Sequence, residues 1–230
     1  MTAYEPKELI VEFLRHRLTD PRSRHTSTSD TFSGDGSTKT FTLTPTAGRS
    51  VQCITNVSVD GTDKLKWQDY TFDPTFQSKV VTFNSAPANG SDNIVITYDE
   101  GTTDWIYPDL AKTTLSTTSY PIMNVLVVNS VGNRMGSYSA PISSTERYQI
   151  DIWVKEKYVT TIGGKKYEGD KLAMYLARQV NLAFEDYVDD LYPKLKHYRL
   201  LNIRDGVWDT ERQVYHVIVE IELEGTSLGE

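Results

Sequence analysis

Near the C-terminal end of the chain, apolar residues occupy every second position, and this pattern constrains the fold more than any other feature. The set is Tyr215, Val217, Val219, Ile221 and Leu223. Successive side chains of a β-strand point to opposite faces of a sheet, so these five share one face. The other face carries His216, Ile218, Glu220, Glu222 and Glu224. We therefore expect a long strand with one face in a core and the other in water or against a partner.

Two other segments follow a helical period. In the first, from Pro6 to Leu18, apolar residues recur at four-residue spacing until Asp20-Pro21 ends the pattern. The second begins at Asp170, which we expect to cap the helix, and ends at Pro193. Its apolar stripe consists of Leu172, Leu176, Val180, Ala183, Phe184, Tyr187 and Leu191. Both helices need a partner surface elsewhere in the fold.

Residues 30–100 have the pattern of a separate all-β module. Ser and Thr make up 13 of the 25 residues from Thr26 to Ser50, which we interpret as a linker into a β-rich unit. Alternation then continues in short segments as far as Tyr98. Asp60-Gly61 and Asn89-Gly90 are predicted hairpin turns, because both central residues of a type I′ turn need positive φ. We expect a small antiparallel sandwich or barrel.

The rest of the chain predicts strands around the second helix. They are expected at 122–128, 147–156 and 198–203, with a Gly- and Ser-rich loop over 129–144, a break at Gly163-Gly164 and a turn at Asp205-Gly206. The predicted fold class is α+β, a small antiparallel sheet with two helices, interrupted by the inserted all-β module. Residues 1–29 and 101–230 would form the core, and residues 30–100 the insertion.

Charge and cysteine content exclude several classes of function. Twenty-four Lys and Arg against 31 Asp and Glu give a net charge of −7, which argues against charge-driven binding of nucleic acid or an anionic membrane. The single cysteine, Cys53, cannot form an internal disulfide or a thiolate zinc cluster. The N-terminus lacks a signal-peptide pattern, and no window resembles a membrane span. We expect a protein that is made in a cytoplasm and stays there at least until it is assembled or released.

No catalytic, cofactor or metal site is predicted. The four histidines are far apart, and no Gly-x-Ser-x-Gly elbow occurs. Gly34-Asp35-Gly36 and Gly163-Gly164-Lys165-Lys166 could bind phosphate, but their pattern favours turns. The aspartates Asp63, Asp69, Asp73, Asp92 and Asp99 could hold calcium, but their spacing favours solvated turns. We therefore expect a protein that is not an enzyme.

Two charge clusters and one tryptophan are candidates for a subunit interface. Arg15 and Arg17 lie at the end of the first helix, where the helix dipole explains cations and an acidic partner would also do so. The dipole disfavours the acidic cluster at the end of the second helix, so these residues form either a solvated face or a contact with a basic patch on a neighbouring subunit. The cluster is Glu185, Asp186, Asp189 and Asp190. Trp153 points away from the apolar face of its strand, so either the sheet is covered on both sides or Trp153 meets another subunit.

Two parts of the sequence resemble structural proteins of tailed bacteriophages. The first is a β-module that recurs in such proteins, matched by DTFSGDGSTKTFTL at 30–43, VSVDG at 57–61, VTF at 81–83, AP at 86–87 and IVITY at 94–98. The second lies in the remainder and looks like the tail-terminator or tail-completion proteins. It rests on the order of elements, with RYQIDIW at 147–153, GDKLA at 169–173 and VYHVIVEIEL at 214–223.

The resemblance implies a structural virion protein of the neck or tail. Its copies would form a ring, a hexamer in the family, that caps the tail tube, docks the head connector and lets DNA pass without specific binding. In such a ring, Glu220, Glu222 and Glu224 could line the lumen, although a solvated strand face also explains them. The alternatives are another neck or connector protein, or a carbohydrate-binding accessory in which Trp67 and Tyr70 stack on sugar.

Overall fold

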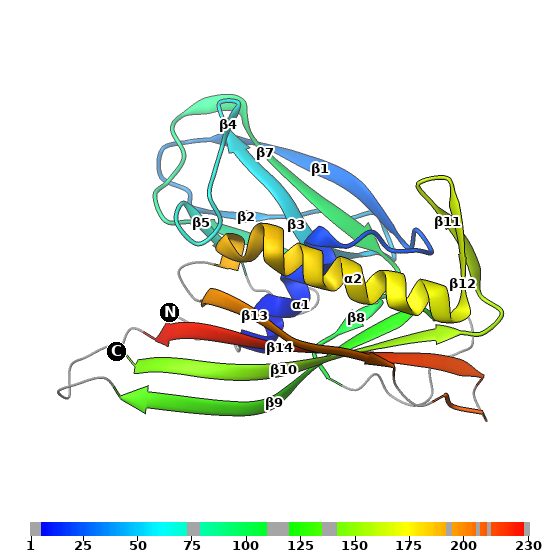
Figure 1. Ribbon diagram of the computed structural model, residues 1–230. Coiled ribbons are helices and arrows are strands. Elements are labelled where there is room, and N and C mark those ends of the chain that lie inside the picture. The colour runs from blue at the N-terminus through cyan, green and yellow to red at the C-terminus, as the bar shows by residue number, and fades with distance from the viewer. Residues whose placement is uncertain are drawn as a thin grey trace. The chain divides into compact units, whose positions relative to one another are not determined.

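The computed structural model describes residues 6–72, 79–109, 120–134, 142–191, 195–205, 208–210 and 213–227 (Figure 1). These residues form two α-helices and several mostly antiparallel sheets, so the α+β expectation is met only in part, because the protein is mostly β. The chain divides into two compact units. Unit 1 comprises the residues up to His16 and Ser23–Asp104, and unit 2 comprises Arg17–Arg22 and the residues from Trp105 onward. The sequence pattern groups the N-terminal helix with the α+β core, whereas most of this helix lies in unit 1.

Helix α1 (Pro6–Arg17) is buried on every side along its central part. All residues from Leu9 to Arg15 are buried, including Glu12 and Arg15, so the expectation of a single apolar stripe is too simple. The carboxylate of Glu12 accepts hydrogen bonds from the Lys66 ammonium at 2.9 Å, and Arg15 is paired with Asp104. Ion pairing therefore permits two charged residues on the buried sides of the helix.

Unit 1 contains two antiparallel sheets around one apolar core. The first has the order β1 (His25–Gly34), β7 (Gly90–Gly101), β3 (Ser50–Val59), β4 (Thr62–Asp63), and the second β2 (Thr40–Thr42), β6 (Val80–Phe83), β5 (Tyr70–Phe72). Both sheets contribute to the core cluster, with Phe41, Phe72 and Val81 from the second and Val57, Ile94 and Ile96 from the first. The β structure expected here is present.

Two local expectations in unit 1 are wrong, and one is confirmed. The first part of the Ser/Thr-rich stretch, residues 26–34, belongs to strand β1 rather than to a linker, because its backbone pairs with β7. Asn89-Gly90 joins no hairpin, since β6 pairs with β2 and β5 whereas β7 pairs with β1 and β3. Asp60 and Gly61 have φ of 52° and 72° between the paired residues Val59 and Thr62, as a type I′ turn requires.

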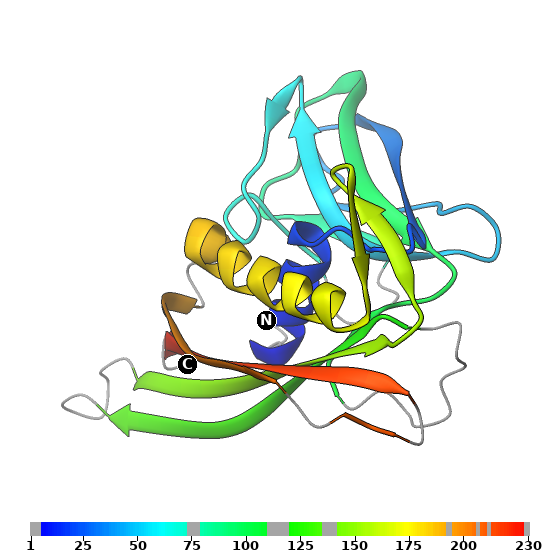
Figure 2. The same cartoon turned by 45° about the vertical axis from the view of Figure 1, so that its right-hand side comes forward.

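Unit 2 is a five-stranded sheet with a helix on one face (Figure 2). The order is β13 (Leu195–Asp205), β14 (Val214–Ser227), β10 (Ile142–Lys155), β9 (Ile122–Arg134), β8 (Ile106–Tyr107). Only the β8 and β9 pairing is parallel. Helix α2 (Gly169–Tyr187) contacts β14 and β10 and continues into the 3-10 helix Val188–Leu191. A small hairpin, β11 (Val159–Ile162) with β12 (Lys165–Glu168), precedes α2.

The core of unit 2 lies between α2 and the sheet face that the alternation predicted. Val217, Val219, Ile221 and Leu223 of β14 are buried, together with Tyr148, Ile150, Ile152 and Val154 of β10. The stripe of α2 is confirmed from Leu172 to Phe184 and at Leu191, which are buried, but the predicted member Tyr187 is 45% exposed. The strand face predicted to be apolar is therefore the face that packs on the helix.

The strand and helix ends differ from the predicted ones. Strands β9 and β10 extend into the segment expected to be a loop, because residues 129–134 find pairing partners despite their composition. Helix α2 begins at Gly169 with Glu168 as its N-cap, so Asp170 lies inside the first turn and caps nothing. Pro193 and Gly206 fall outside the described residues. No described helix is both long and apolar enough to cross a membrane.

Candidate functional site

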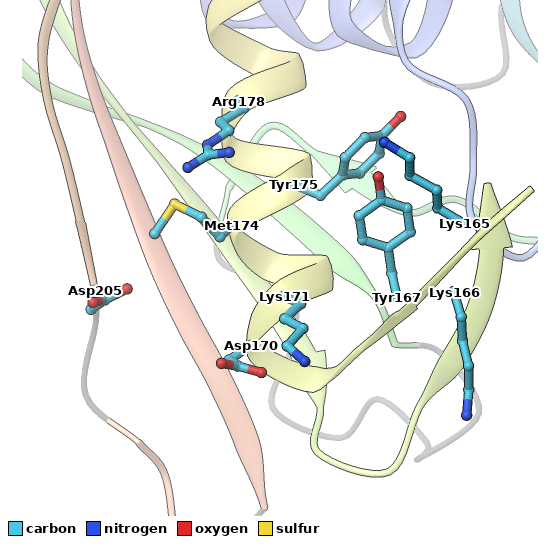
Figure 3. A pocket seen from close by; sticks show the side chains of 9 residues that line it. All are labelled: Lys165, Lys166, Tyr167, Asp170, Lys171, Met174, Tyr175, Arg178 and Asp205. Atoms are coloured by element: carbon cyan, nitrogen blue, oxygen red, sulfur yellow. The ribbon is translucent and has the colours of Figure 1, made fainter. Parts of the chain in front are cut away.

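A pocket of about 540 Å³ opens beside the N-terminal half of α2 in unit 2 (Figure 3). Helix α2 supplies one wall, the β11-β12 hairpin supplies another, and the end of β13 contributes a single residue. The lining residues are Lys165, Lys166, Tyr167, Asp170, Lys171, Met174, Tyr175, Arg178 and Asp205. We call this the basic pocket, because its walls carry four cations and two carboxylates.

A two-residue turn positions the hairpin wall of the pocket. Gly163 and Gly164 have φ of 57° and 78°, and Ile162 pairs with Lys165 across them. The turn interpretation of this Gly-Gly-Lys-Lys segment is therefore confirmed, since a type I′ turn needs positive φ at both central positions. The same turn brings Lys165 and Lys166 to the pocket.

Two tyrosines form the inner part of the basic pocket. The rings of Tyr167 and Tyr175 lie side by side, with centroids 4.6 Å apart. Burial raises the pKa of Tyr175 above its usual value, and the neighbouring Tyr167 adds to the effect. The Tyr175 phenol is therefore neutral near pH 7 and does not offset the lysine charges. Met174 and the two tyrosines are half-buried, with the tyrosines on the hairpin side of α2 and Met174 on the side toward β13 (Figure 3).

The charge of the pocket walls is positive overall. Lys165, Lys166, Lys171 and Arg178 outnumber Asp170 and Asp205, and all four cations are exposed. Among the described residues, the ion pair found for these cations joins Lys166 to Glu168 at 3.9 Å, with both side chains more than half exposed. Such an exposed pair adds little stability. The pocket can therefore receive an anionic group that brings some apolar surface.

The acidic cluster at the other end of α2 is partly paired within the chain. Asp190 forms an ion pair with Arg17, whose guanidinium also lies over the Tyr187 ring at 4.1 Å. Glu185, Asp186 and Asp189 are exposed, and no ion pair joins them to another part of the described chain. The predicted interface therefore separates into a paired residue, Asp190, and three carboxylates that point to solvent.

Arg15 does not lie on a surface, in contrast to the prediction. Its side chain is 2% exposed and is paired with Asp104, which is equally buried. An acidic partner surface on another molecule cannot reach it. The two arginines at the end of α1 thus have different surroundings. Arg15 forms a buried ion pair in unit 1, and Arg17 forms a partly exposed ion pair in unit 2.

The outer face of the sheet carries the predicted carboxylate row together with arginines. Glu222 lies between two arginines on neighbouring strands, with Arg147 Nε at 2.9 Å and Arg199 at 4.0 Å. Glu220 accepts a hydrogen bond from Arg204 at 2.8 Å, and Glu224 is exposed. The row is a set of cross-strand ion pairs, because the strand register brings the arginines of β13 and β10 beside it.

Trp153 contacts a histidine on the same face. Its ring stacks on His216 with centroids 3.8 Å apart, and the His216 ring is 2.8 Å from the Asp151 carboxylate. Asp151 is buried, and Trp153 is half-buried. Trp153 and His216 are paired positions on β10 and β14, so the contact lies within one face of the sheet, and both interpretations of Trp153 stay predictions.

The residues considered for sugar binding belong to the core of unit 1. Tyr70 is 3% exposed, and Trp67 stacks on Phe72 with centroids 5.5 Å apart. Tyr70 has no exposed face for a sugar, and half-buried Trp67 uses one face of its ring to pack against the core. The structural interpretation of Trp67 is confirmed, and the carbohydrate-binding hypothesis loses Tyr70.

The other candidates for chemistry have structural roles. Cys53 is buried, and desolvation followed by the charges of Glu12 and Asp99 raises its pKa, so the thiolate is scarce. Asp63 accepts a hydrogen bond from Asn56, and Asp69 from the backbone of Leu65. Within the described residues, no three His, Cys, Asp or Glu side chains converge as metal ligands would. Asp73 lies outside the described residues.

The sequence offered Lys165 and Lys166 as a possible phosphate site, but it did not show that the hairpin and the helix line one pocket, although eight of the nine lining residues fall between Lys165 and Arg178. A partial signal exists on α2, where Lys171, Tyr175 and Arg178 follow the exposed side at helical spacing. Pairing these residues with Lys165 and Lys166 requires the hairpin geometry. The chain matches none of the protein-family models with which it was compared, and no curated protein matches its sequence either.

Proposed function

We propose that the protein is a structural subunit of the head-tail joint of a tailed bacteriophage. In this role, copies associate into a ring that ends growth of the tail tube, docks to the head connector and leaves a channel for DNA. The resemblance of the sequence to tail-terminator and tail-completion proteins supplies the role. The protein acts through surfaces, and its partners are itself, the tail tube protein and the connector.

The observation that carries the proposal is the charge matching on the outer face of the sheet. A channel wall must let DNA slide, and phosphates bind strongly where cations are free to replace their counterions. Arg147, Arg199 and Arg204 lie beside Glu220 and Glu222, so their charges are compensated locally. A face of this kind neither attracts phosphates strongly nor repels them as a bare row of carboxylates would.

We further propose that residues 30–100 are a module inserted into the α+β core. Support comes from the antiparallel pairing of β1 with β7, in which His25 lies opposite Gly101. The His25 ring is also 3.2 Å from the Thr103 carbonyl. The chain thus enters and leaves the β structure at adjacent positions, as an insertion needs.

Deleting residues 30–100 with a short Gly/Ser bridge tests the insertion. The deletion removes Lys66 and leaves Glu12 buried without its cation, so it should be made with Glu12→Gln. We expect unit 2 to keep its circular dichroism and a cooperative melt. An aggregated product in the Glu12→Gln background would contradict the module boundary.

Electron microscopy of the purified protein, alone and with tail tubes, tests the ring. We expect rings of uniform diameter that cap the tubes, and gold-labelled antibody at the head-tail joint of intact particles. Label elsewhere on the tail or neck would replace the proposal with another virion position. Binding to a glycan array that Trp67→Ala abolishes would instead favour the carbohydrate-binding hypothesis.

A further inference from the structure

The exposed side of α2 separates its charges in the direction that the helix dipole disfavours. Lys171 lies in the first turn beside Asp170 and Arg178 lies at the middle of the helix, whereas Glu185, Asp186 and Asp189 lie at the C-terminal end, where the last turn has no basic residue. Cations near a helix N-terminus and anions near its C-terminus each reduce helix stability. The carboxylates at the C-terminal end would therefore be stabilised by cations from outside the helix.

Within one chain, the cations and the carboxylates of α2 are too far apart to form ion pairs with each other. At 1.5 Å per residue, Lys171 and Glu185 are roughly 21 Å apart along the helix. This separation is about two and a half times the distance of ~8 Å over which physiological salt screens exposed charges. An ion-pair partner for each end therefore has to lie outside the helix. A second copy of the chain carries partners of both signs.

The two surfaces also match in their apolar parts. The acidic end, consisting of Glu185, Asp186 and Asp189, follows Leu182, which is 44% exposed. The lining of the basic pocket includes Met174, Tyr167 and Tyr175 as well as its cations. An apolar side chain flanked by carboxylates fits a half-apolar pocket flanked by lysines, since burial and charge then act together.

Nucleic acid fits the basic pocket less well than a second copy does. Asp170 and Asp205 stand among the cations and would repel a phosphate chain that runs along the wall. The net charge of −7 also disfavours approach of DNA to the molecule. A compact acidic helix end can instead place its carboxylates beside the lysines and avoid these two aspartates.

We propose that the basic pocket of one copy receives the acidic end of α2 from the next copy, in a head-to-tail contact. The contact joins two different surfaces, so each added copy leaves one pocket and one acidic end unused until the assembly closes. Closure into a ring rests on the proposed function, whereas the contact itself does not. Asp190 takes no part, because it pairs with Arg17 of its own chain.

Charge reversal in the full-length chain tests the contact. One variant carries Lys165→Glu, Lys171→Glu and Arg178→Glu, and the other carries Glu185→Lys, Asp186→Lys and Asp189→Lys. All six side chains are exposed, so the fold should survive, which circular dichroism checks. Like charges facing each other across an interface cost several kcal/mol, so each variant should raise the concentration for half-maximal association roughly a hundred-fold.

Complementation identifies the pairing. An equimolar mixture of the two variants, and a single chain with all six changes, should both regain association in light scattering, because opposite charges face each other again. The control carries Lys64→Glu, Lys79→Glu and Lys157→Glu, which change the net charge equally away from the pocket, and it should associate far better than the pocket variant.

Several outcomes would overturn the contact. Charge reversal of either surface would do so if it left association unchanged, and so would a mixture of the two variants that did not recover association. A wild-type protein that forms only dimers, or that stays monomeric at low salt, would also contradict the contact. Pocket-dependent binding of labelled duplex DNA by a monomer would assign the pocket to nucleic acid instead. If antibody still labels the head-tail joint in any of these cases, the proposed function stands and the contact falls. If association is sensitive to reversal but no label reaches the joint, the contact stands and the proposed function falls.

Discussion

The guanidinium of Arg17 forms an ion pair with the carboxylate of Asp190, a residue 173 positions later in the chain. The two residues belong to the basic and acidic clusters that the sequence places at the ends of two helices. Each cluster is a candidate for contact with another subunit, yet these two members satisfy each other within unit 2. Within the acidic cluster, Asp190 therefore contributes to the fold, whereas Glu185, Asp186 and Asp189 stay available for contact with another subunit.

Asp190→Asn should reduce stability, whereas Asp189→Asn should not. The first change leaves Arg17 without its anion, while Asp189 has no ion pair in the described part of the chain. Both partners are partly exposed, so we expect a loss of about 0.5 kcal/mol in the free energy of unfolding. Urea unfolding followed by circular dichroism measures the difference, and equal stabilities of the two variants would contradict the assigned pair.

Lys66→Met should destabilise unit 1 much more than an exposed lysine substitution does. It leaves the Glu12 carboxylate, which is 4% exposed, without the ammonium beside it. Removing one partner of a buried pair costs about 3–5 kcal/mol, and the 17% exposure of Lys66 favours the lower value. Thermal melts should show the loss, with Lys79→Met as the exposed control.

The second variant of this pair separates charge from packing. Combining Lys66→Met with Glu12→Gln should recover most of the lost stability, because no buried charge then lacks a partner. A double variant as unstable as Lys66→Met alone would show that the lysine acts through its stem rather than its charge.

Replacing the carboxylates of the outer sheet face should increase DNA binding in steps. The Gln series at Glu220, Glu222 and Glu224 uncovers the neighbouring arginines, and the Lys series adds three further cations. We expect salt-sensitive retention of duplex DNA in the order wild type, Gln series, Lys series, measured by filter binding at two salt concentrations. Slower genome ejection should accompany it in particles.

A single change provides the control for this series. Glu156 is exposed and lies outside the row, so Glu156→Lys alters the net charge as Glu222→Lys does. DNA binding that rises equally in both variants would remove the channel-wall assignment. The Lys series should also melt earlier, since three arginines lose their anions, and this loss must be measured separately.

The stability of unit 1 should fall at acid pH through Glu100. Burial of its carboxylate opposes ionisation, but hydrogen bonds from the Thr46 hydroxyl and backbone, both 2.7 Å, and the charge of Arg49 lower its pKa below the usual 4.5. A lowered pKa in the folded state means that the stabilisation is complete above pH 4.5 and is lost as the pH falls through the folded value.

Thr46→Val removes the hydroxyl from this carboxylate and should shift the acid unfolding transition to higher pH. Thr42→Val, at an exposed position on β2, is the matched control and should leave the transition in place. Tryptophan fluorescence during acid titration gives the midpoints, and identical shifts in the two variants would exclude Glu100 as the source.

Local patterns in the sequence predicted the elements that need only some apolar surface to pack against, whichever part of the chain supplies it. The apolar stripe of α2 and the apolar face of β14 pack against each other. Turns with obligatory positive φ, at Asp60-Gly61 and Gly163-Gly164, were equally readable, because the constraint lies within two residues.

Pairing between distant segments decided what the patterns did not. Residues 26–34 and 129–134 have the composition of linkers, but a neighbouring strand with unused backbone groups makes them strands. Asn89-Gly90 has the composition of a hairpin turn, but the strands on either side of it belong to different sheets. Amino-acid composition indicates which backbone conformation a segment prefers on its own. The hydrogen bonds gained by pairing with a neighbouring strand can outweigh this preference.

By itself, the sequence determined that helices and antiparallel sheets are both present, the apolar faces of α2 and β14, and the positions of the charge clusters, since these follow from periodicity and composition. Only the tertiary structure decided what each charge meets. It buried Arg15 against Asp104, joined Arg17 to Asp190, set arginines beside Glu222 and assembled four cations from separate segments into the basic pocket. Charge acts through space over several ångströms, and the distances between distant residues are fixed only by the fold.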